Sequence, residues 1–333
     1  MREADIRPAD ILAEYLRLSA ADADLLFSDR SKLVLRPCPG CGRDWPRAEF
    51  TKHNFNLVRC GHCETLYVNP CPTQVQLTAL YADSPSTHYW ARVFFPAVAE
   101  ARRSRIFAPR AEKALALASA GGATAVICEV GAGAGLFLEE CRRLLPSAVL
   151  RAVEPGVELA DDCRRKGFQT FEGVAAEASH DPAWANQADL VVCFEVIEHT
   201  ADTPEFFASL TALAKPGGMV LVSGLCGDGF DIRVLGAKSN AVSPPHHLTF
   251  LSRNGAQRLL ERCGLVDGQV FTPGELDVDI VANALKADVS IVIDPFLRGI
   301  IECADANARA AFQKFLKENG LSSHMWIIGR KAK

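Results

Sequence analysis

One stretch, residues 125–137, constrains the fold more than any other part of the chain. It begins with an apolar, β-branched run that predicts a buried strand, and it continues with Gly131, Gly133 and Gly135. Apolar residues at helical spacing follow from Leu136. Glycine lets the backbone approach a ligand closely, and the first turn of a helix offers free N–H groups to an anion. Strand, glycine loop and helix in this order therefore predict a nucleotide-binding turn.

The glycine spacing distinguishes two kinds of nucleotide loop. The dinucleotide fingerprint needs its third glycine at the sixth position, which is Leu136 in this chain. The loop reads Gly-x-Gly-x-Gly instead, and Glu129 lies two residues before it. This pattern resembles motif I of the class I S-adenosylmethionine (SAM)-dependent methyltransferases. On the loop alone, a tight turn without a ligand remains the competing interpretation.

Three further blocks extend the resemblance. A strand at 148–154 ends in Glu154, at the distance from the loop where an acid can accept hydrogen bonds from ribose hydroxyls. A strand at 189–194 runs into Glu195-Val196-Ile197-Glu198-His199, which resembles the Glu-x-x-Glu-His motif IV of ubiquinone-type and related small-molecule methyltransferases. A Lys-Pro-Gly-Gly turn at 215–218 then precedes a strand at 219–223, as is typical of the family.

The resemblance implies a fold and a cofactor. The fold is α/β, a Rossmann-like, mostly parallel sheet of seven strands with helices on both faces, in which the last strand (325–329) runs antiparallel between the fifth and the sixth (within 267–284). The cofactor is SAM. The residues implied to bind it are Glu129, Gly131, Ala132, Gly133, Gly135, Glu154, Pro155, Val174, Ala175, Phe194, Glu195 and Tyr89, the last as part of a lid.

Such an enzyme mainly has to align the acceptor with the methyl group of SAM, and it does not have to activate that methyl group. The methyl group on a sulfonium is already reactive, and a base helps when the acceptor is a hydroxyl or an amine. Histidine is the side chain best suited to that role near neutral pH. The candidates are His246 and His247, which follow an irregular stretch (224–243) predicted as a substrate lid, His199, which alternatively braces the cleft, and Glu195 as a different base.

The N-terminal part carries a separate signal, two Cys-x-x-Cys units 18 residues apart. Paired knuckles at this separation predict a zinc ribbon held by four thiolates, Cys38, Cys41, Cys60 and Cys63. Four thiolates leave no open position, so the zinc is predicted to be structural. His62 is a competing ligand inside the second knuckle. A zinc ribbon in this place resembles the N-terminal module of some bacterial SAM methyltransferases, many of which modify small molecules in surface-polysaccharide or secondary-metabolite pathways.

These signals predict three regions. Residues 1–83 hold a helix at 8–27, the zinc ribbon with strands at 50–59 and 66–68, and a further helix. Residues 84–120 form a linker, at its Ser- and Pro-rich start, and a lead-in helix broken or kinked by its prolines. Residues 121–333 are the methyltransferase domain, with a helical insertion near 285–320. The lead-in helix carries Arg102, Arg103, Arg105 and Arg110, as a solvated face or as a contact to an anionic substrate.

The charge and hydropathy of the chain indicate which classes of binding partner to expect. A net charge of −4 and a pI of about 6.1 do not indicate a nucleic-acid footprint. No apolar run reaches membrane-spanning length and no signal peptide opens the chain, so a cytoplasmic protein with reduced cysteines is expected. The predicted function is methyl transfer to a small-molecule acceptor, with a hydroxyl of a sugar-like or secondary metabolite as the favoured one. The alternatives are an RNA methyltransferase that grips RNA with the zinc ribbon, and a SAM-binding protein without activity. The sequence does not determine the oligomeric state.

Overall fold

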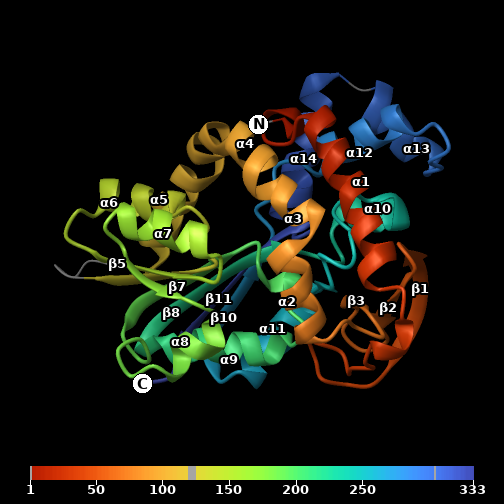
Figure 1. Cartoon of the computed structure of the whole chain (residues 1–333). Coiled ribbons are helices and arrows are strands. Elements are labelled where there is room, and N and C mark those ends of the chain that lie inside the picture. The colour runs from red at the N-terminus through yellow and green to blue at the C-terminus, as the bar shows by residue number, and fades with distance from the viewer. Residues whose placement is uncertain (1, 119–124, 304) are drawn as a thin grey trace.

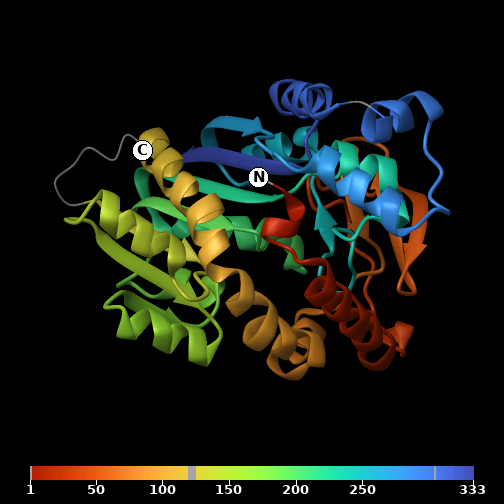
Figure 2. The same ribbon diagram turned by 90° about the horizontal axis from the view of Figure 1, so that it is seen from above.

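A sheet of seven strands forms the centre of the molecule (Figures 1 and 2). The structure, a computed structural model, describes residues 2–118, 125–303 and 305–333. The strand order is β10-β11-β8-β7-β4-β5-β6, with β11 antiparallel to both of its neighbours and the other pairs parallel. This confirms the predicted fold class and the predicted antiparallel last strand. The strands are β4 (Val126–Val130), β5 (Val149–Glu154), β6 (Gln169–Glu172), β7 (Ala188–Phe194), β8 (Ala214–Leu225), β10 (Leu265–Phe271) and β11 (His324–Lys331).

Helices cover both faces of this sheet because its central strands are apolar on both sides. In β7, Val191 and Cys193 pack into one buried cluster, while Leu190 and Val192 pack into another on the opposite face. Figure 1 shows helices against both faces of the sheet. One face carries α5 (Ala108–Ala118), α6 (Leu136–Leu144) and α7 (Val157–Arg165), and the other carries α8 (Ala175–His180), α9 (Thr203–Leu213) and α11 (Arg253–Arg262).

A second, four-stranded sheet contains the cysteine region. Its strands are antiparallel, in the order β1 (Pro46–Lys52), β2 (Phe55–Cys60), β3 (Leu66–Val68) and β9 (Thr249–Phe250). The prediction of one strand over 50–59 is wrong. His53 and Asn54 both have positive φ, at 47° and 61°, and this conformation turns the chain into a two-residue hairpin. The last strand, β9, comes from a distant part of the chain, so the methyltransferase region completes the sheet of the N-terminal region.

Helices surround the second sheet and lead to the first. The helix predicted at 8–27 is α1 (Ala9–Leu26), and α2 (Gln74–Asp83) follows the cysteine region. The segment predicted as a linker forms a short helix, α3 (Pro85–Tyr89), because Ser84 caps it and Pro85 occupies its first turn. π-helical turns (Trp90–Phe94 and Arg103–Phe107) separate α3, α4 (Phe95–Arg102) and α5. The predicted boundary near residue 120 lies outside the described residues.

The chain after β8 is more helical than predicted. The irregular segment 224–243 contains α10 (Phe230–Leu235), and the second half of the predicted strand at 267–284 is α12 (Asp277–Ala287). The acids at the start of α12 favour a helix N-terminus, a signal that apolar content alone concealed. The predicted Lys-Pro-Gly-Gly turn lies inside β8, where the register shifts and Gly217 has φ of 76°. The remaining helices are α13 (Pro295–Arg298), α14 (Ala306–Glu318), a π-helical turn (Gly299–Cys303) and 3₁₀ turns at Glu3–Asp5, Arg30–Lys32, Ile197–His199 and Gly236–Lys238.

Among the described residues, no helix combines the length and the apolar character that crossing a bilayer requires.

Candidate active site

The glycine loop has the conformation that its sequence predicts. Gly131, Gly133 and Gly135 have φ of 73°, 54° and 72°, which disfavours any residue with a Cβ. The Gly131 N–H donates to the Val153 carbonyl at 2.9 Å, so the loop is held against β5. A Cβ built on Gly133 would meet no atom within 4 Å. At Gly133 the loop therefore borders open space of the kind that a bound ligand fills, and Ala132 directly precedes this glycine.

Two acids stand at the carboxyl ends of neighbouring strands beside this loop. Glu129 is buried, its Oε2 has no hydrogen-bond partner in the part of the chain that the structure describes, and burial raises its pKa well above the ordinary value. Glu154 is also buried, which raises its pKa, and its carboxylate accepts from the Gly133 N–H at 2.7 Å and the Gly156 N–H at 2.9 Å. An unpartnered buried oxygen next to an open loop fits a polar ligand with a donor group, and the amino group of SAM is such a donor.

The other predicted cofactor residues lie around the same end of the sheet. Phe194 is buried at the end of β7, with its ring 4.9 Å from that of Phe137. Val174 precedes α8 and is 43% exposed, whereas Ala175 in its first turn is buried, so only Val174 offers side-chain surface. Pro155 is exposed after β5, and Tyr89 is partly buried in α3.

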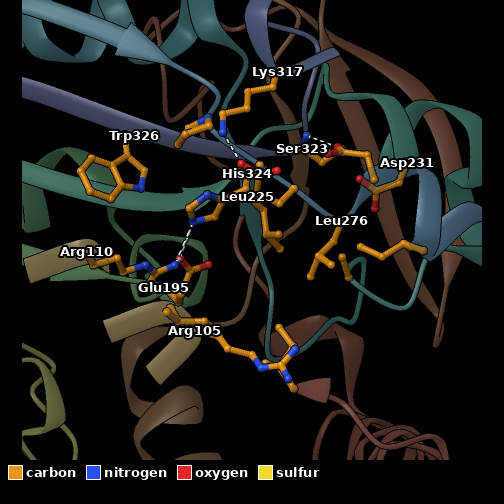
Figure 3. Close-up of a pocket in the computed structure, with 18 of the residues that line it drawn as sticks. Arg105, Arg110, Glu195, Leu225, Asp231, Leu276, Lys317, Ser323, His324 and Trp326 are labelled. Atoms are coloured by element: carbon orange, nitrogen blue, oxygen red, sulfur yellow. Dashed lines mark hydrogen bonds and ion pairs between the residues drawn. The ribbon is translucent and has the colours of Figure 1, made fainter. Parts of the chain in front are cut away.

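Glu195 follows β7 in a strained backbone conformation, with φ of 57°. Its Oε1 accepts from Arg110 Nη2 and from Ser223 Oγ, both at 2.7 Å, and lies 2.9 Å from His324 Nε2 (Figure 3). Burial alone would raise the pKa of Glu195, but His324 and Arg110 hold it well below the ordinary value. A carboxylate so strongly paired is better suited to orient Arg110 and His324 than to accept a proton.

Two of the predicted histidines lie side by side. The rings of His199 and His247 are 4.7 Å apart and nearly perpendicular. Nδ1 of His247 lies 2.6 Å from the Ala241 carbonyl, which can only accept, so the neutral His247 ring carries its proton on Nδ1 and presents an unprotonated Nε2. Nδ1 of His199 lies 2.8 Å from the Tyr81 hydroxyl, which also lies 3.2 Å from the His246 carbonyl. When the single hydroxyl proton bonds that carbonyl, the hydroxyl oxygen accepts from Nδ1–H of His199, and Nε2 of this ring is unprotonated as well.

The third histidine differs in its contacts. His246 is only 2% exposed, and its Nε2 bonds to Ser86 Oγ at 2.9 Å, so helix α3 already satisfies this ring nitrogen. Burial lowers the pKa of His246 to about 3 and that of His247 to about 4, and it lowers the pKa of His199 well below the ordinary value. All three imidazoles are consequently neutral near pH 7.

These histidines line a cavity of about 280 Å³ that adjoins a second one of about 330 Å³. Glu195 and Arg102 belong to the walls of both cavities. Glu198 is buried in the first, and its Oε2 has no partner. One ligand atom each of Glu198, His199 and His247 lie within 4.8 Å of one another, a donor set of a kind that can also hold a divalent cation. Trp90, which follows the predicted lid residue Tyr89, lines this cavity.

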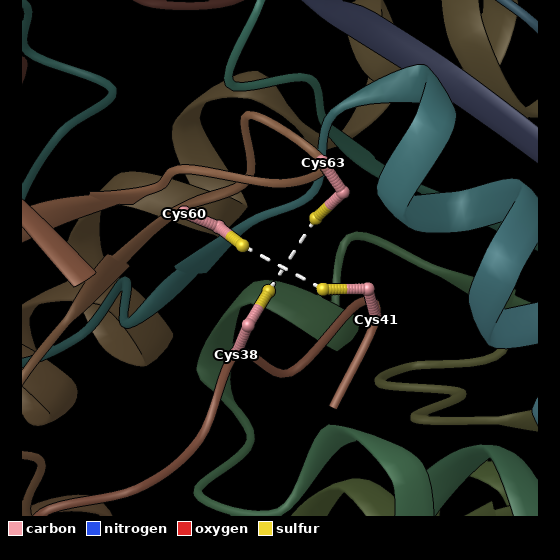
Figure 4. A group of neighbouring side chains, drawn as sticks. All are labelled: Cys38, Cys41, Cys60 and Cys63. Atoms are coloured by element: carbon pink, nitrogen blue, oxygen red, sulfur yellow. Dashed lines mark hydrogen bonds between the residues drawn. The ribbon is translucent and has the colours of Figure 1, made fainter. Parts of the chain in front are cut away.

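The four predicted metal ligands, Cys38, Cys41, Cys60 and Cys63, form one compact group (Figure 4). The Sγ atoms of Cys38 and Cys63 are 3.4 Å apart, and those of Cys41 and Cys60 are 3.5 Å apart. A disulfide needs about 2.05 Å, so these are free thiols. Tetrahedral zinc with bonds of about 2.3 Å would hold its sulfurs roughly 3.8 Å apart, close to the observed spacing. His62 is not a member of the group.

Comparisons with known proteins support the same class. A family model described as a methyltransferase domain matches residues 98–270, just over half of the chain. The ubiquinone biosynthesis O-methyltransferase of Dinoroseobacter shibae is 31% identical over 191 residues, which cover 49% of this chain and 72% of that protein. The enzyme of the same name from Methylococcus capsulatus is 33% identical over 106 residues, 29% of this chain and only 42% of that protein. The chain therefore belongs to the SAM-dependent methyltransferases, as the motifs predicted.

Among solved structures, the chain is similar to the geranyl diphosphate C-methyltransferase of Streptomyces coelicolor. It is 14% identical, with a TM-score of 0.48, and the match covers 76% of this chain and 88% of that chain. A likeness at this level does not bear on the substrate.

Sequence reasoning missed two residues that shape the site. His324 is not among the residues that the sequence predicts for the site, although its Nε2 contacts Glu195, 129 positions earlier in the chain. A signal for it exists, because β11 pairs antiparallel with β8 and so brings His324 opposite Leu225, at the carboxyl end of β8. Tyr81 is not among the predicted site residues either. Its hydrogen bond to His199 depends on where α2 packs, and no spacing in the sequence indicates that.

Proposed function

We propose that this protein transfers the methyl group of SAM to a hydroxyl oxygen of a small molecule. The observation that carries the proposal is the pair of imidazoles, His199 and His247, whose rings lie 4.7 Å apart in the cavity that Glu195 also lines. A hydroxyl must lose its proton as its oxygen attacks the methyl carbon, and a neutral imidazole within hydrogen-bond reach accepts that proton. The names of the curated relatives, O-methyltransferases, support oxygen as the acceptor atom.

The chain's own residues would divide the work as follows. SAM supplies a methyl group on a sulfonium, which needs no further activation. Glu129 would hold its amino group, Glu154 its ribose hydroxyls, and the open side of Gly133 would leave room for its backbone. The acceptor's O–CH₃ bond forms as the S–CH₃ bond breaks, and the hydroxyl proton moves to Nε2 of His199 or His247. Tyr81 and Ala241 keep both rings in the tautomer that can receive it.

We also infer that the four cysteines hold a structural zinc ion. The convergence of four sulfurs within 4.8 Å of one another supports this, as does their Cys-x-x-Cys spacing. No water-accessible position remains on a tetrahedral ion with four thiolates, so this zinc would stabilise the fold and take no part in methyl transfer.

Methyl transfer is tested with purified protein and SAM that carries an isotopic label on its methyl group. The protein is incubated with a bacterial extract divided into small-molecule and RNA fractions. We expect label in the small-molecule fraction, in a product that is heavier than its precursor by about one CH₂ plus the mass of the label, because one hydrogen is replaced with a labelled methyl group. Label in RNA would contradict the proposal and indicate that the zinc ribbon grips RNA. Absence of label from both fractions would favour the inactive SAM-binding alternative.

Cofactor binding is tested separately by calorimetry. In Gly133→Ala the new Cβ points into the open space of the loop, so we expect SAM affinity to fall at least about 100-fold, some 2.8 kcal/mol. Gly264→Ala is the matched control, because Gly264 also has positive φ (69°) and no atom within 4 Å of a Cβ, but it lies at the end of α11. Equal SAM affinity in both variants would show that the loop is not the cofactor site.

A further inference from the structure

The larger cavity beside Glu195 combines apolar walls with an excess of positive charge (Figure 3). Its volume is about 330 Å³. Apolar side chains make up much of its lining, among them Ile106, Leu225, Leu276, Ile280 and Trp326. Six basic residues also line it, namely Arg7, Arg102, Arg105, Arg110, Lys113 and Lys317. A cavity of this kind can bind a ligand that is largely apolar and that carries a negative charge.

Most of these cations already have a carboxylate. Arg105 pairs with Asp5, and Lys317 pairs with Glu275. Arg110 donates to Glu195 at 2.7 Å.

The remaining two partnered cations are held more weakly. Arg7 lies 3.9 Å from Glu3, near the limit of an ion pair. Lys113 lies over the rings of Phe271 and Trp326, 4.4 and 4.6 Å from their centres, which is a cation–π arrangement.

Arg102 is the cation for which the described residues supply no carboxylate. It forms no ion pair there, its Nε is buried without a hydrogen-bond partner, and its Cζ lies 6.0 Å from the centre of the Phe95 ring, at the far limit of a cation–π arrangement. Burial lowers the pKa of Arg102 to about 10, which still leaves it charged near pH 7. The side chain as a whole is partly buried, and the hydration that its Nε has lost is not replaced by an anion, which disfavours the folded protein. Its position in the walls of both cavities, shared with Glu195, places it next to the proposed site of methyl transfer.

The neighbouring carboxylates do not neutralise it. Glu198 and Asp231 each keep one oxygen without a partner among the described residues, but burial raises the pKa of Glu198 well above its ordinary value and that of Asp231 to about 7, which disfavours their charged forms. Glu195 is engaged by Arg110, Ser223 and His324. Asp277 accepts hydrogen bonds from Gln313, Ser322 and Ser323, on the far side of the cavity. The charge of Arg102 is thus free to pair with a group that enters from outside the chain.

We infer that the methyl acceptor is an anionic small molecule, an apolar body carrying a carboxylate or phosphate group that Arg102 binds. This deepens the proposed function and rests on it, because it names the class of acceptor. The fork of guanidinium N–H groups can donate two parallel hydrogen bonds to either oxyanion. The apolar walls would cover the rest of the acceptor, and the anchored anion would hold its hydroxyl toward His199 and His247. A neutral sugar, the acceptor favoured from sequence, would leave Arg102 without a partner.

The activity test separates acceptors by charge. The small-molecule extract is resolved by anion exchange into anionic and neutral fractions, and each is incubated with labelled SAM and the full-length protein. We expect label in the anionic fraction, and with Arg102→Gln a KM for that acceptor about 10- to 100-fold higher at nearly unchanged kcat, since a charge-assisted hydrogen bond is lost. Arg92→Gln is the matched control, because Arg92 is an exposed arginine in the same helical region. Label in the neutral fraction alone, or an unchanged KM in Arg102→Gln, would overturn the inference.

A binding test keeps this inference separate from the proposed function, since it needs no turnover. Benzoate, phenyl phosphate and benzyl alcohol are titrated by calorimetry at constant ionic strength into the wild type, Arg102→Gln and Arg92→Gln. We expect one of the two anions to bind at least about 10-fold more tightly than the neutral alcohol, in the wild type and Arg92→Gln but not in Arg102→Gln. The anion that binds better identifies carboxylate or phosphate. Anion binding that is absent, or that is equal in all three proteins, would overturn the inference even if methyl transfer is found.

Thermal unfolding distinguishes an anion-binding role of Arg102 from a role in stabilising the fold. Because the charge has no partner, Arg102→Gln should unfold at the same temperature as the wild type or higher. A marked fall in Tm would show that Arg102 supports the fold and would contradict its assignment as an anion anchor.

Discussion

The cysteine cluster and the histidine cluster are both buried groups of metal- or proton-binding side chains, but the chain assembles them differently. The four cysteines fall within residues 38–63, on two knuckles with the same internal spacing. The histidine cluster joins His199 and His247 to Tyr81, which lies 118 positions before His199. Short-range spacing made the first group recognisable as a unit. The second became a unit only through packing, which also determines the tautomers on which its chemistry depends.

The two clusters are nevertheless connected by a continuous set of contacts. Arg262 of α11 donates to the carbonyls of Pro39 and Gly40, at 3.2 and 2.7 Å, and so holds the first knuckle. β9, which precedes α11, pairs with β3 of the cysteine region. The residue before β9, Leu248, donates its N–H to the Glu198 carbonyl at 2.7 Å, beside the histidines. The difference between the clusters can therefore be tested by substitutions in the cysteine cluster, in the histidine cluster and at the Arg262 contact that links the two regions.

The largest effect is expected at the cysteines. Cys60→Ser should lose the single zinc ion expected per chain and unfold the region around β1–β3, since structural zinc contributes roughly 10–16 kcal/mol of apparent binding free energy. Elemental analysis and hydrogen exchange measure the two results. Cys263→Ser, a partly buried cysteine outside the cluster, should keep the zinc. Native wild-type protein without zinc would remove the metal assignment.

The histidines should affect catalysis without unfolding the protein. His247→Gln keeps a polar side chain but removes the base, so kcat is expected to fall about 10²- to 10⁴-fold. SAM affinity should not change, and calorimetry checks this. The exposed His180→Gln serves as the control. If neither His247→Gln nor His199→Gln slows methyl transfer, the acceptor loses its proton to another group.

The buried histidines should also make the fold sensitive to acid. The folded pKa of His246 is about 3, below the unfolded value of about 6.5. The unfolded chain therefore binds the proton first, and stability is lost as pH falls from about 6.5 toward 3. Between pH 7 and pH 5 this should cost about 1–2 kcal/mol.

Denaturant unfolding of His246→Gln at both pH values isolates this effect from other groups. Its neighbours His247 and His53 stay in place, as do Tyr15 and Tyr81, so only one titrating group changes. The difference in free energy of unfolding between pH 7 and pH 5 should be smaller in the variant than in the wild type. An identical difference in the two proteins would show that His246 is not protected from protonation by the fold.

The smallest effect is expected at the contact between the regions. Arg262→Gln loses two hydrogen bonds to the knuckle carbonyls, so stability should fall by about 1–2 kcal/mol, or a few degrees in Tm. Arg258→Gln is the control, because this exposed neighbour bonds only to Asn254 among the described residues. Calorimetric scans measure both. If Arg262→Gln also weakens zinc retention, the docking of α11 helps to hold the cysteine cluster, and an unchanged zinc affinity would show that the cluster is independent of it.

The sequence by itself determined the parts of this protein whose partners are close along the chain. Local spacing predicts the glycine loop, the cysteine knuckles and the acids at the ends of β4 and β5, because backbone conformation and short turns depend on adjacent residues. Local patterns misled where two signals overlapped, as in the hairpin at His53 and Asn54 and in α12, whose apolar residues also suit a strand.

Tertiary structure alone decided the chemistry of the cleft. The proton positions on His199 and His247 depend on Tyr81 and Ala241, and the charge of Glu195 depends on Arg110 and His324. These pairs come from segments far apart in the sequence, so no spacing rule relates them. The physical reason is desolvation. Whether a buried charge or ring nitrogen has a hydrogen-bond partner depends on which strands and helices pack against it in the folded chain. The Nε of Arg102 has no such partner among the described residues.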